Sequence, residues 1–179
     1  MTRRNPDFTR LFLQQARRVL EEMYVPRILR CLEMLSGEEI WARPNAASNS
    51  VGNLVLHLEG NVRQWIISGL GGAPDLRQRD REFQERGPLP RRELASRLER
   101  TVDQACRVLR KLSARDLARV HAIQGFRVTG MAAVFHVAEH FSHHAGQIIL
   151  ATKMLRGVDL EFTHLPGKRQ KTRTAFPAV

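Results

Sequence analysis

Apolar residues recur at helical spacing in four long stretches of the chain. Within each stretch the apolar positions form a stripe with a period near 3.6 residues, and polar residues fill the other positions, which is typical of amphipathic helices. We therefore predict an all-α protein whose leading architecture is a four-helix bundle. The stretches span roughly residues 7–36, 50–69, 90–112 and 129–156.

Capping residues mark several ends of these helices. Residues 5–7 (Asn-Pro-Asp) place a cap residue, a proline and an acid at the start of the first helix. Thr129 can cap the fourth helix, and Gly157 suits its C-terminal end. We assign residues 1–157 to the bundle and 158–179 to a basic, irregular tail.

The connections between the helices are long. The charged stretch 75–87 exceeds the usual length of an interhelical loop, and we expect it to cover a functional site. Residues 114–128 are expected to form a loop with a turn of helix and no strand. Long connections of this kind leave room for a topology other than simple up-and-down.

Composition places the chain among globular proteins. It has 179 residues, 42% of them apolar, which is enough for one domain with a sizeable core. No apolar run has the length of a membrane span and no signal peptide is visible, so we expect a cytoplasmic protein without a membrane partner. Cys31 and Cys106 fall on different predicted helices, and we expect them to be small buried side chains.

The net charge of +11 raises the possibility of nucleic-acid binding. Most basic residues are arginines scattered among acids, and the dense run 168–173 has no interleaved aromatic residues. We expect this run to be solvated, as we do the arginines of the first and third helices. Nucleic-acid binding is the least favoured of the alternatives. The helix arginines in question are Arg17, Arg18, Arg97 and Arg100.

Four of the seven histidines cluster on the fourth predicted helix. His140 and His144 stand one turn apart at the edge of its apolar stripe, while His136 and His143 lie further round, toward the polar side. His57 flanks the apolar stripe of the second helix in the same way. If these two helices are neighbours, three imidazoles converge.

Three neutral imidazoles with open positions are typical of a catalytic metal site. A ligand set rich in His and poor in Cys suits Zn, Ni, Cu, Mn or Fe. The alternative is that His57 is a hydrogen-bonded structural residue and that the pair of His140 and His144 is exposed or structural and binds no metal. His121 and His164 are expected to lie exposed in loops.

Two segments resemble motifs of the DinB-like superfamily. Residues 49–58 (N-S-V-G-N-L-V-L-H-L) resemble its second-helix motif, and residues 140–148 (H-F-S-H-H-A-G-Q-I) are similar to its fourth-helix motif, H-x-x-H-H-x-G-Q-I. The motifs come in the expected order, and the resemblance covers residues 7–157. Together with residues 60–61 (Gly-Asn), the match indicates a branch of unknown function.

The resemblance implies a four-helix bundle, often a homodimer, that holds one divalent metal ion (Zn, Ni, Mn or Fe). Carried over by position, the metal ligands are His57, His140 and His144. In many relatives an Arg precedes the Gly-Gln pair, but Ala145 stands here, so a substrate contact from that position is not carried over.

Superfamily members resemble both metal-dependent hydrolases and enzymes that use low-molecular-weight thiols. We therefore predict a metal-dependent enzyme, a hydrolase or thiol transferase, that acts on a small molecule. Its alternative is a non-catalytic metal- or ligand-binding module linked to stress. Glu59 and Glu139 point away from the histidines, so neither is assigned as a base. Candidates for side chains that hydrogen-bond to the metal ligands and orient them are His136, His143 and Gln147.

Overall fold

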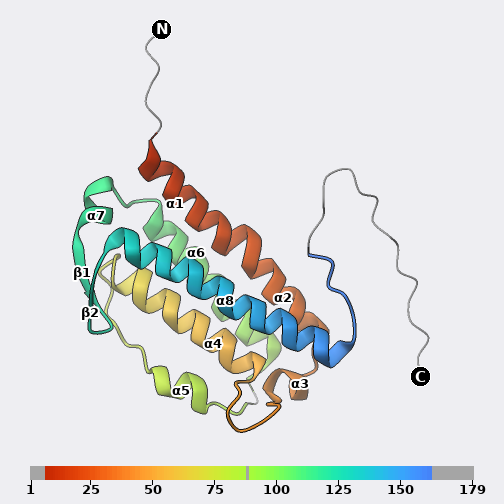
Figure 1. The fold of residues 1–179 in the computed structure, drawn as a ribbon. Helices are drawn as coiled ribbons and strands as arrows, with labels where there is room; N and C mark the ends of the chain where they lie inside the picture. Colours follow the sequence, from red (N-terminus) through yellow and green to blue (C-terminus); the bar gives the residue numbers. More distant parts are fainter. Residues whose placement is uncertain (1–6, 88, 163–179) are drawn as a thin grey trace, which may run out of the picture.

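The computed structural model describes residues 7–87 and 89–162 (Figure 1). Four long helical units form a bundle, as the sequence predicts. The elements, in chain order, are α1 (Phe8–Arg18), the π-helical η1 (Val19–Tyr24), α2 (Val25–Met34), α3 (Gly37–Trp41), α4 (Val51–Val62), the π-helical η2 (Arg63–Ser68), α5 (Arg79–Gln84), α6 (Arg91–Leu109), α7 (Ala114–Ala118), β1 (Val120–Ile123), β2 (Phe126–Thr129) and α8 (Gly130–Arg156).

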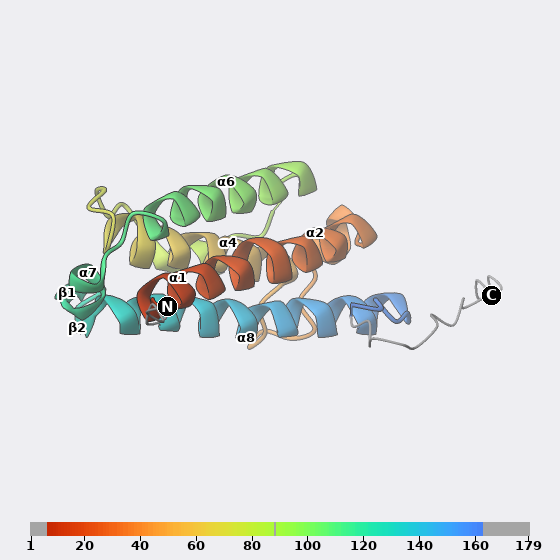
Figure 2. The ribbon, with the colours of Figure 1, turned by 90° about the horizontal axis from the view of Figure 1, so that it is seen from above.

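The bundle is not simply up-and-down. The unit from α1 to α2 runs in the same direction as α8, whereas α4 and α6 both run in the opposite direction (Figures 1 and 2). Each of α2 and α4 contacts both α6 and α8. Because α4 and α6 are parallel, the chain must return along the bundle between them, and the long segment that carries α5 makes this return.

Helix α4 is enclosed on all sides. Every residue from Val51 to Val62 is buried, because α3, α5, α6 and α8 all pack against this helix. Its polar residues, such as Asn53 and His57, therefore need partners within the protein. Despite this apolar character, none of the described helices is both long and apolar enough to cross a membrane.

The caps of the long helices agree with the sequence except at the N-terminus. Thr129 accepts a hydrogen bond from the Ala132 amide at the start of α8, and Gly157 ends that helix with a φ of 63°. Asp7, rather than Asn5, is the N-cap of α1, since its side chain accepts from the Arg10 amide. A side chain that accepts this bond satisfies one of the orphan amides of the first turn.

The prediction that residues 114–128 contain no strand is wrong, whereas the predicted turn of helix is present. The segment contains α7 and an antiparallel hairpin in which β1 pairs with β2. The hairpin turns at Gln124 and Gly125, both with positive φ. Each strand has only four residues, so the sequence carries little signal for it.

His121 is buried in this hairpin, not exposed as predicted. Its Nδ1 lies 3.1 Å from the carbonyl oxygen of Gly69, and its Nε2 lies 3.3 Å from that of Asp116. His121 therefore ties the hairpin to the end of the α4–η2 unit and to α7. His164 and the basic run 168–173 lie outside the described residues.

Both cysteines are free and buried, as predicted. Cys31 lies in α2 and Cys106 in α6, and neither is exposed to solvent. Burial, with a smaller contribution from nearby Glu21, raises the pKa of the Cys106 thiol to about 12. Burial also raises the pKa of the Cys31 thiol, so both thiols are kept protonated, whereas nucleophilic reactivity needs the thiolate.

Candidate metal centre

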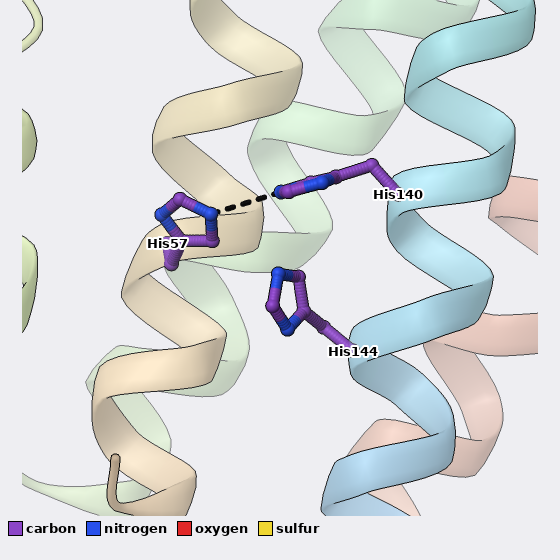
Figure 3. A group of neighbouring side chains, drawn as sticks. All are labelled: His57, His140 and His144. Atoms are coloured by element: carbon purple, nitrogen blue, oxygen red, sulfur yellow. Dashed lines mark hydrogen bonds between the residues drawn. The ribbon is translucent and has the colours of Figure 1, made fainter. Parts of the chain in front are cut away.

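Three imidazoles converge between α4 and α8 (Figure 3). His57 comes from α4, and His140 and His144 come from α8. One ring nitrogen of each lies within 4.8 Å of the others, and the Nε2 atoms of His57 and His140 are 2.9 Å apart. The structure thus brings together the three residues that the sequence places on facing helix edges.

Helix geometry explains this convergence. His140 and His144 are one turn apart, so their rings leave α8 on the same side, and their ring centroids are 4.5 Å apart. His57 lies midway along α4, with its ring centroid 4.9 Å from that of His140 and 5.0 Å from that of His144. Because α4 packs against α8, the His57 ring lies opposite the two rings from α8.

Glu82 fixes the orientation of the His57 ring. The Nδ1 atom of His57 lies 2.9 Å from Glu82 Oε2. Arg77 Nη2 is 3.2 Å from the same Nδ1, but it donates to Glu82 Oε2 at 2.9 Å. A carboxylate can only accept, so Nδ1 carries the proton and Nε2 keeps its lone pair directed at the other two histidines.

A buried ion pair stands behind this contact. Arg77 Nε donates to Glu82 Oε1 at 2.7 Å, and the two side chains are 3% and 10% exposed. Arg77 Nη1 also donates to Gln64 at 2.9 Å. Burial alone would raise the pKa of Glu82, but the hydrogen bonds from Arg77 and His57 outweigh it and hold that pKa below its usual value. Glu82 is therefore an ionised acceptor.

The motif on α4 holds the α5 segment over His57. The side-chain amide of Asn53 donates to the carbonyl oxygens of Glu82 and Glu85 at 2.8 and 2.9 Å. At Gly60 a Cβ atom would lie 2.0 Å from Glu82 Oε1, so only glycine leaves room for the carboxylate. The ring of Phe83 covers His57 at 4.6 Å between centroids. The charged stretch 75–87 thus covers part of the candidate site, as expected from its length.

Gln147 orients His144 from the other side. The Gln147 Oε1 atom lies 2.7 Å from His144 Nδ1, so the ring donates through Nδ1 and its Nε2 is left as an acceptor. The Gln147 Nε2 atom lies 3.3 Å from the Nε2 of His143, which is exposed. His143 thus contacts Gln147 and stands outside the three-imidazole group.

His136 extends the row of histidines along α8 without joining the group. Its Nε2 lies 3.3 Å from Asn61 Nδ2, and its ring lies on Trp65 with 4.0 Å between centroids. Its ring also stacks on His140 at 5.3 Å. These contacts make His136 a packing neighbour of His140.

Two histidines of α8, His140 and His144, are held in the neutral form. Burial, together with the positive charges that His144 and His57 would carry, lowers the pKa of His140 to about 3. Burial also lowers the pKa of His144, although its bond to Gln147 opposes this effect. A neutral imidazole is the form that binds a metal ion.

The donor set fits a divalent metal ion. Two lone pairs cannot face each other at the 2.9 Å that separates His57 Nε2 from His140 Nε2, so a proton or a metal ion must share them. Around a tetrahedral ion with bonds of 2.0–2.1 Å, ligand nitrogens stand about 3.3 Å apart. The spacing of 2.9 Å in the pair is slightly shorter than this value, and the nitrogen of His144 lies within 4.8 Å of both.

The acids nearest in sequence to the histidines are not part of the group. Glu59 is buried on another side of α4, where it accepts from Arg63 Nε at 3.1 Å and from Thr101 Oγ1 at 3.0 Å. Glu139 is exposed on α8. Ala145 is fully buried, so its side chain faces the core and not the site.

Arg77 and Glu82 are site residues that the sequence does not reveal. Each is one of several like charges in the stretch 75–87, and no periodicity distinguishes them. A glycine at position 60, inside a predicted helix, is the one trace in the sequence that another part of the chain approaches α4 closely.

Comparison with known proteins supports the fold. A DinB-like protein (YjoA) from Bacillus subtilis is 17% identical, with a TM-score of 0.61 over 84% of this chain and 94% of its own. A DinB-like protein from Bacillus cereus ATCC 10987 is 16% identical, with a TM-score of 0.61 over 80% of this chain and 90% of its own. No curated protein matches the sequence significantly. A family model described as a protein of unknown function, DUF1572, matches residues 7–169. The chain therefore belongs to the DUF1572 family, and it has the DinB-like fold.

Proposed function

We propose that the protein binds one divalent transition-metal ion through the Nε2 atoms of His57, His140 and His144. The observation that carries this proposal is the convergence of three imidazoles whose ring nitrogens lie within 4.8 Å of one another. The Nδ1 protons of His57 and His144 are directed to Glu82 and Gln147, which leaves both Nε2 atoms free to coordinate.

We further propose that the protein is a metal-dependent enzyme that acts on a small molecule. With three protein ligands and open positions, a bound metal ion lowers the pKa of a water or thiol and polarises a carbonyl group. Two of the ligands have hydrogen-bond partners that orient their rings: Glu82, paired with Arg77, contacts His57, and Gln147 contacts His144. Phe83 covers one side of His57, and this apolar cover strengthens electrostatic interactions at the site.

Two reaction classes agree with this arrangement, hydrolysis and transfer of a low-molecular-weight thiol. No carboxylate other than that of Glu82 contacts the three rings in the described part of the chain, and Glu82 is already used by His57 and Arg77. We therefore assign no carboxylate as the general base. A turnover screen of metal-loaded protein with ester, amide and thiol-conjugate substrates separates the two classes. Metal binding without turnover of any of them would favour a non-catalytic metal-binding module.

Metal analysis of protein purified without a histidine tag tests the metal site. We expect about one metal ion per chain in the wild type, and none after replacement of His57, His140 and His144 by Ala. His143→Ala is the matched control, because His143 is exposed and next to His144 but outside the group. A wild-type protein that holds no metal and cannot be reloaded would refute the proposal. The homodimer and the cytoplasmic location stay predictions.

A further inference from the structure

A pocket of about 490 Å³ lies between α4, α6 and the segment that carries α5. None of the three histidines lines it. The wall that separates it from His57 is the Arg77–Glu82 ion pair, which contributes to both. The pocket is therefore a neighbour of the candidate metal centre, with a different chemical character.

Five arginines line this pocket together with three glutamates. Arg77 belongs to the ion pair with Glu82, and the other four arginines come from three elements: Arg63, Arg81, Arg97 and Arg100. Arg100 is exposed and Arg97 is partly exposed, as expected for a solvated helix face, and both also line the pocket. At its floor, buried Glu59 accepts from Arg63 Nε at 3.1 Å and from Arg97 Nη2 at 3.3 Å. One carboxylate thus positions two guanidinium groups, which keep further N–H donors.

The other arginines have no such partner. Arg81 and Arg100 form no ion pair with a carboxylate in the part of the chain that the structure describes, and Arg100 donates only to Ser96 Oγ. Arg77 differs from them, because it donates to both oxygens of Glu82 and to Gln64 and is 3% exposed. The charge available to a ligand therefore comes first from Arg81 and Arg100, because Arg63 and Arg97 share the charge of Glu59 and Arg77 is paired with Glu82. Glu85 also lines the pocket, but its carboxylate accepts from the backbone amides of Arg86 and Gly87.

One part of the pocket wall is apolar. Leu56, Leu76 and Leu89 line it, and Leu76 is 81% exposed although it faces this pocket. The volume falls within the range of about 300–1,000 Å³ that is usual for small-molecule sites. An inorganic anion would satisfy the arginines but would leave the leucines uncovered.

We propose that this pocket binds a small molecule that carries an oxyanion group, phosphate or carboxylate, on an apolar body. Planar guanidinium groups recognise both oxyanions through paired hydrogen bonds, and the leucines favour an apolar portion of the ligand. This site does not require a metal ion, so it stands or falls independently of the proposed metal centre.

Calorimetric titration of metal-free protein in low-salt, phosphate-free buffer tests the ligand chemistry. Phenyl phosphate, benzoate, inorganic phosphate and phenol serve as probes. We expect one of the two aromatic anions to bind with a stoichiometry of one and more tightly than inorganic phosphate, and the tighter of the two identifies the oxyanion. Phenol should not bind. Equal binding of phenol and phenyl phosphate, or no binding of any anion, would overturn the proposal.

Single substitutions locate the binding. Arg81→Gln and Arg100→Gln should each weaken binding of the aromatic anion by about tenfold, since each removes a charge-assisted hydrogen bond. Arg92→Gln is the matched control on α6, exposed and outside the pocket, and should have no effect. Leu76→Ser should weaken binding of the aromatic anion but not of inorganic phosphate, which a general loss of folding could not produce.

A variant of the metal centre keeps the two proposals apart. His140→Ala in combination with His144→Ala should leave anion binding unchanged, because neither side chain lines the pocket. If this variant loses anion binding, or if Arg92→Gln weakens it as much as Arg81→Gln, the pocket is not the binding site.

Discussion

Replacement of Glu82 by Gln tests whether the α5 segment supports the metal centre. The Glu82 carboxylate accepts hydrogen bonds from Arg77 Nε and Nη2 and from His57 Nδ1. Glutamine keeps the size of the side chain and one carbonyl oxygen. It removes the negative charge, however, and places an amide N–H₂ group where an acceptor stood.

The size of the effect follows from burial. Arg77 is 3% exposed, so loss of its partner leaves a buried charge without compensation. Breaking a buried ion pair from one side costs about 3–5 kcal/mol, and we expect about 3 kcal/mol because Gln retains one acceptor. In a chain of this length the melting temperature should fall by about 6–12 °C. Metal affinity should fall by about 10- to 100-fold, because His57 loses the acceptor that orients its ring.

Calorimetric melting of metal-free protein measures the loss of stability, and competition with a chelator measures the change in affinity. Asp80→Asn is the control, since Asp80 is an exposed acid on the same helix. Adding Arg77→Met to Glu82→Gln should restore part of the stability, because it removes the uncompensated charge, while the metal affinity stays low. If Glu82→Gln matches Asp80→Asn in both measurements, the supporting role of Glu82 is refuted.

Two further predictions concern pH and the glycines of the bundle. In metal-free protein the pKa of His140 is about 3 against an ordinary value of 6.5, and that of His144 is also lowered, so between these pH values the unfolded chain binds more protons. Urea unfolding from pH 7 to pH 4 should therefore show stability falling as the pH falls, and a flat profile would contradict this. Gly60→Ala should lower both stability and metal affinity, because the new Cβ would lie 2.0 Å from Glu82 Oε1. Gly146→Ala, where nothing lies within 4 Å, should instead raise the unfolding free energy by up to about 1 kcal/mol, and equal effects of the two substitutions would argue against the close contact at Gly60.

The helices and the histidine group were accessible from the sequence because both follow from helical periodicity. The spacing of His140 and His144 places them on one side of a helix whatever lies opposite. The position of His57 at the edge of an apolar stripe directs it toward a neighbouring helix. The complete burial of α4 was harder to predict from the sequence, because its polar residues suggest that one face of the helix is exposed.

The supporting contacts were not accessible, because they depend on where a polar segment docks. The α5 helix has no buried residue and no apolar stripe, so its place on α4 is set by side-chain hydrogen bonds such as those of Asn53. His121 illustrates the same limit. Its ring lies within hydrogen-bond distance of the carbonyl oxygen of Gly69, which is 52 residues away along the chain. Long-range polar contacts of this kind leave little trace in hydrophobic periodicity.

X-ray absorption spectroscopy at the metal edge of zinc-loaded protein tests the central claim most directly. The account predicts three imidazole nitrogens at about 2.0–2.1 Å from the ion in the wild type, and fewer after His140→Ala. His143→Ala should leave the wild-type spectrum unchanged. A spectrum with sulfur ligands, one with oxygen ligands alone, or one that is the same in His140→Ala and the wild type would contradict a metal ion held by His57, His140 and His144.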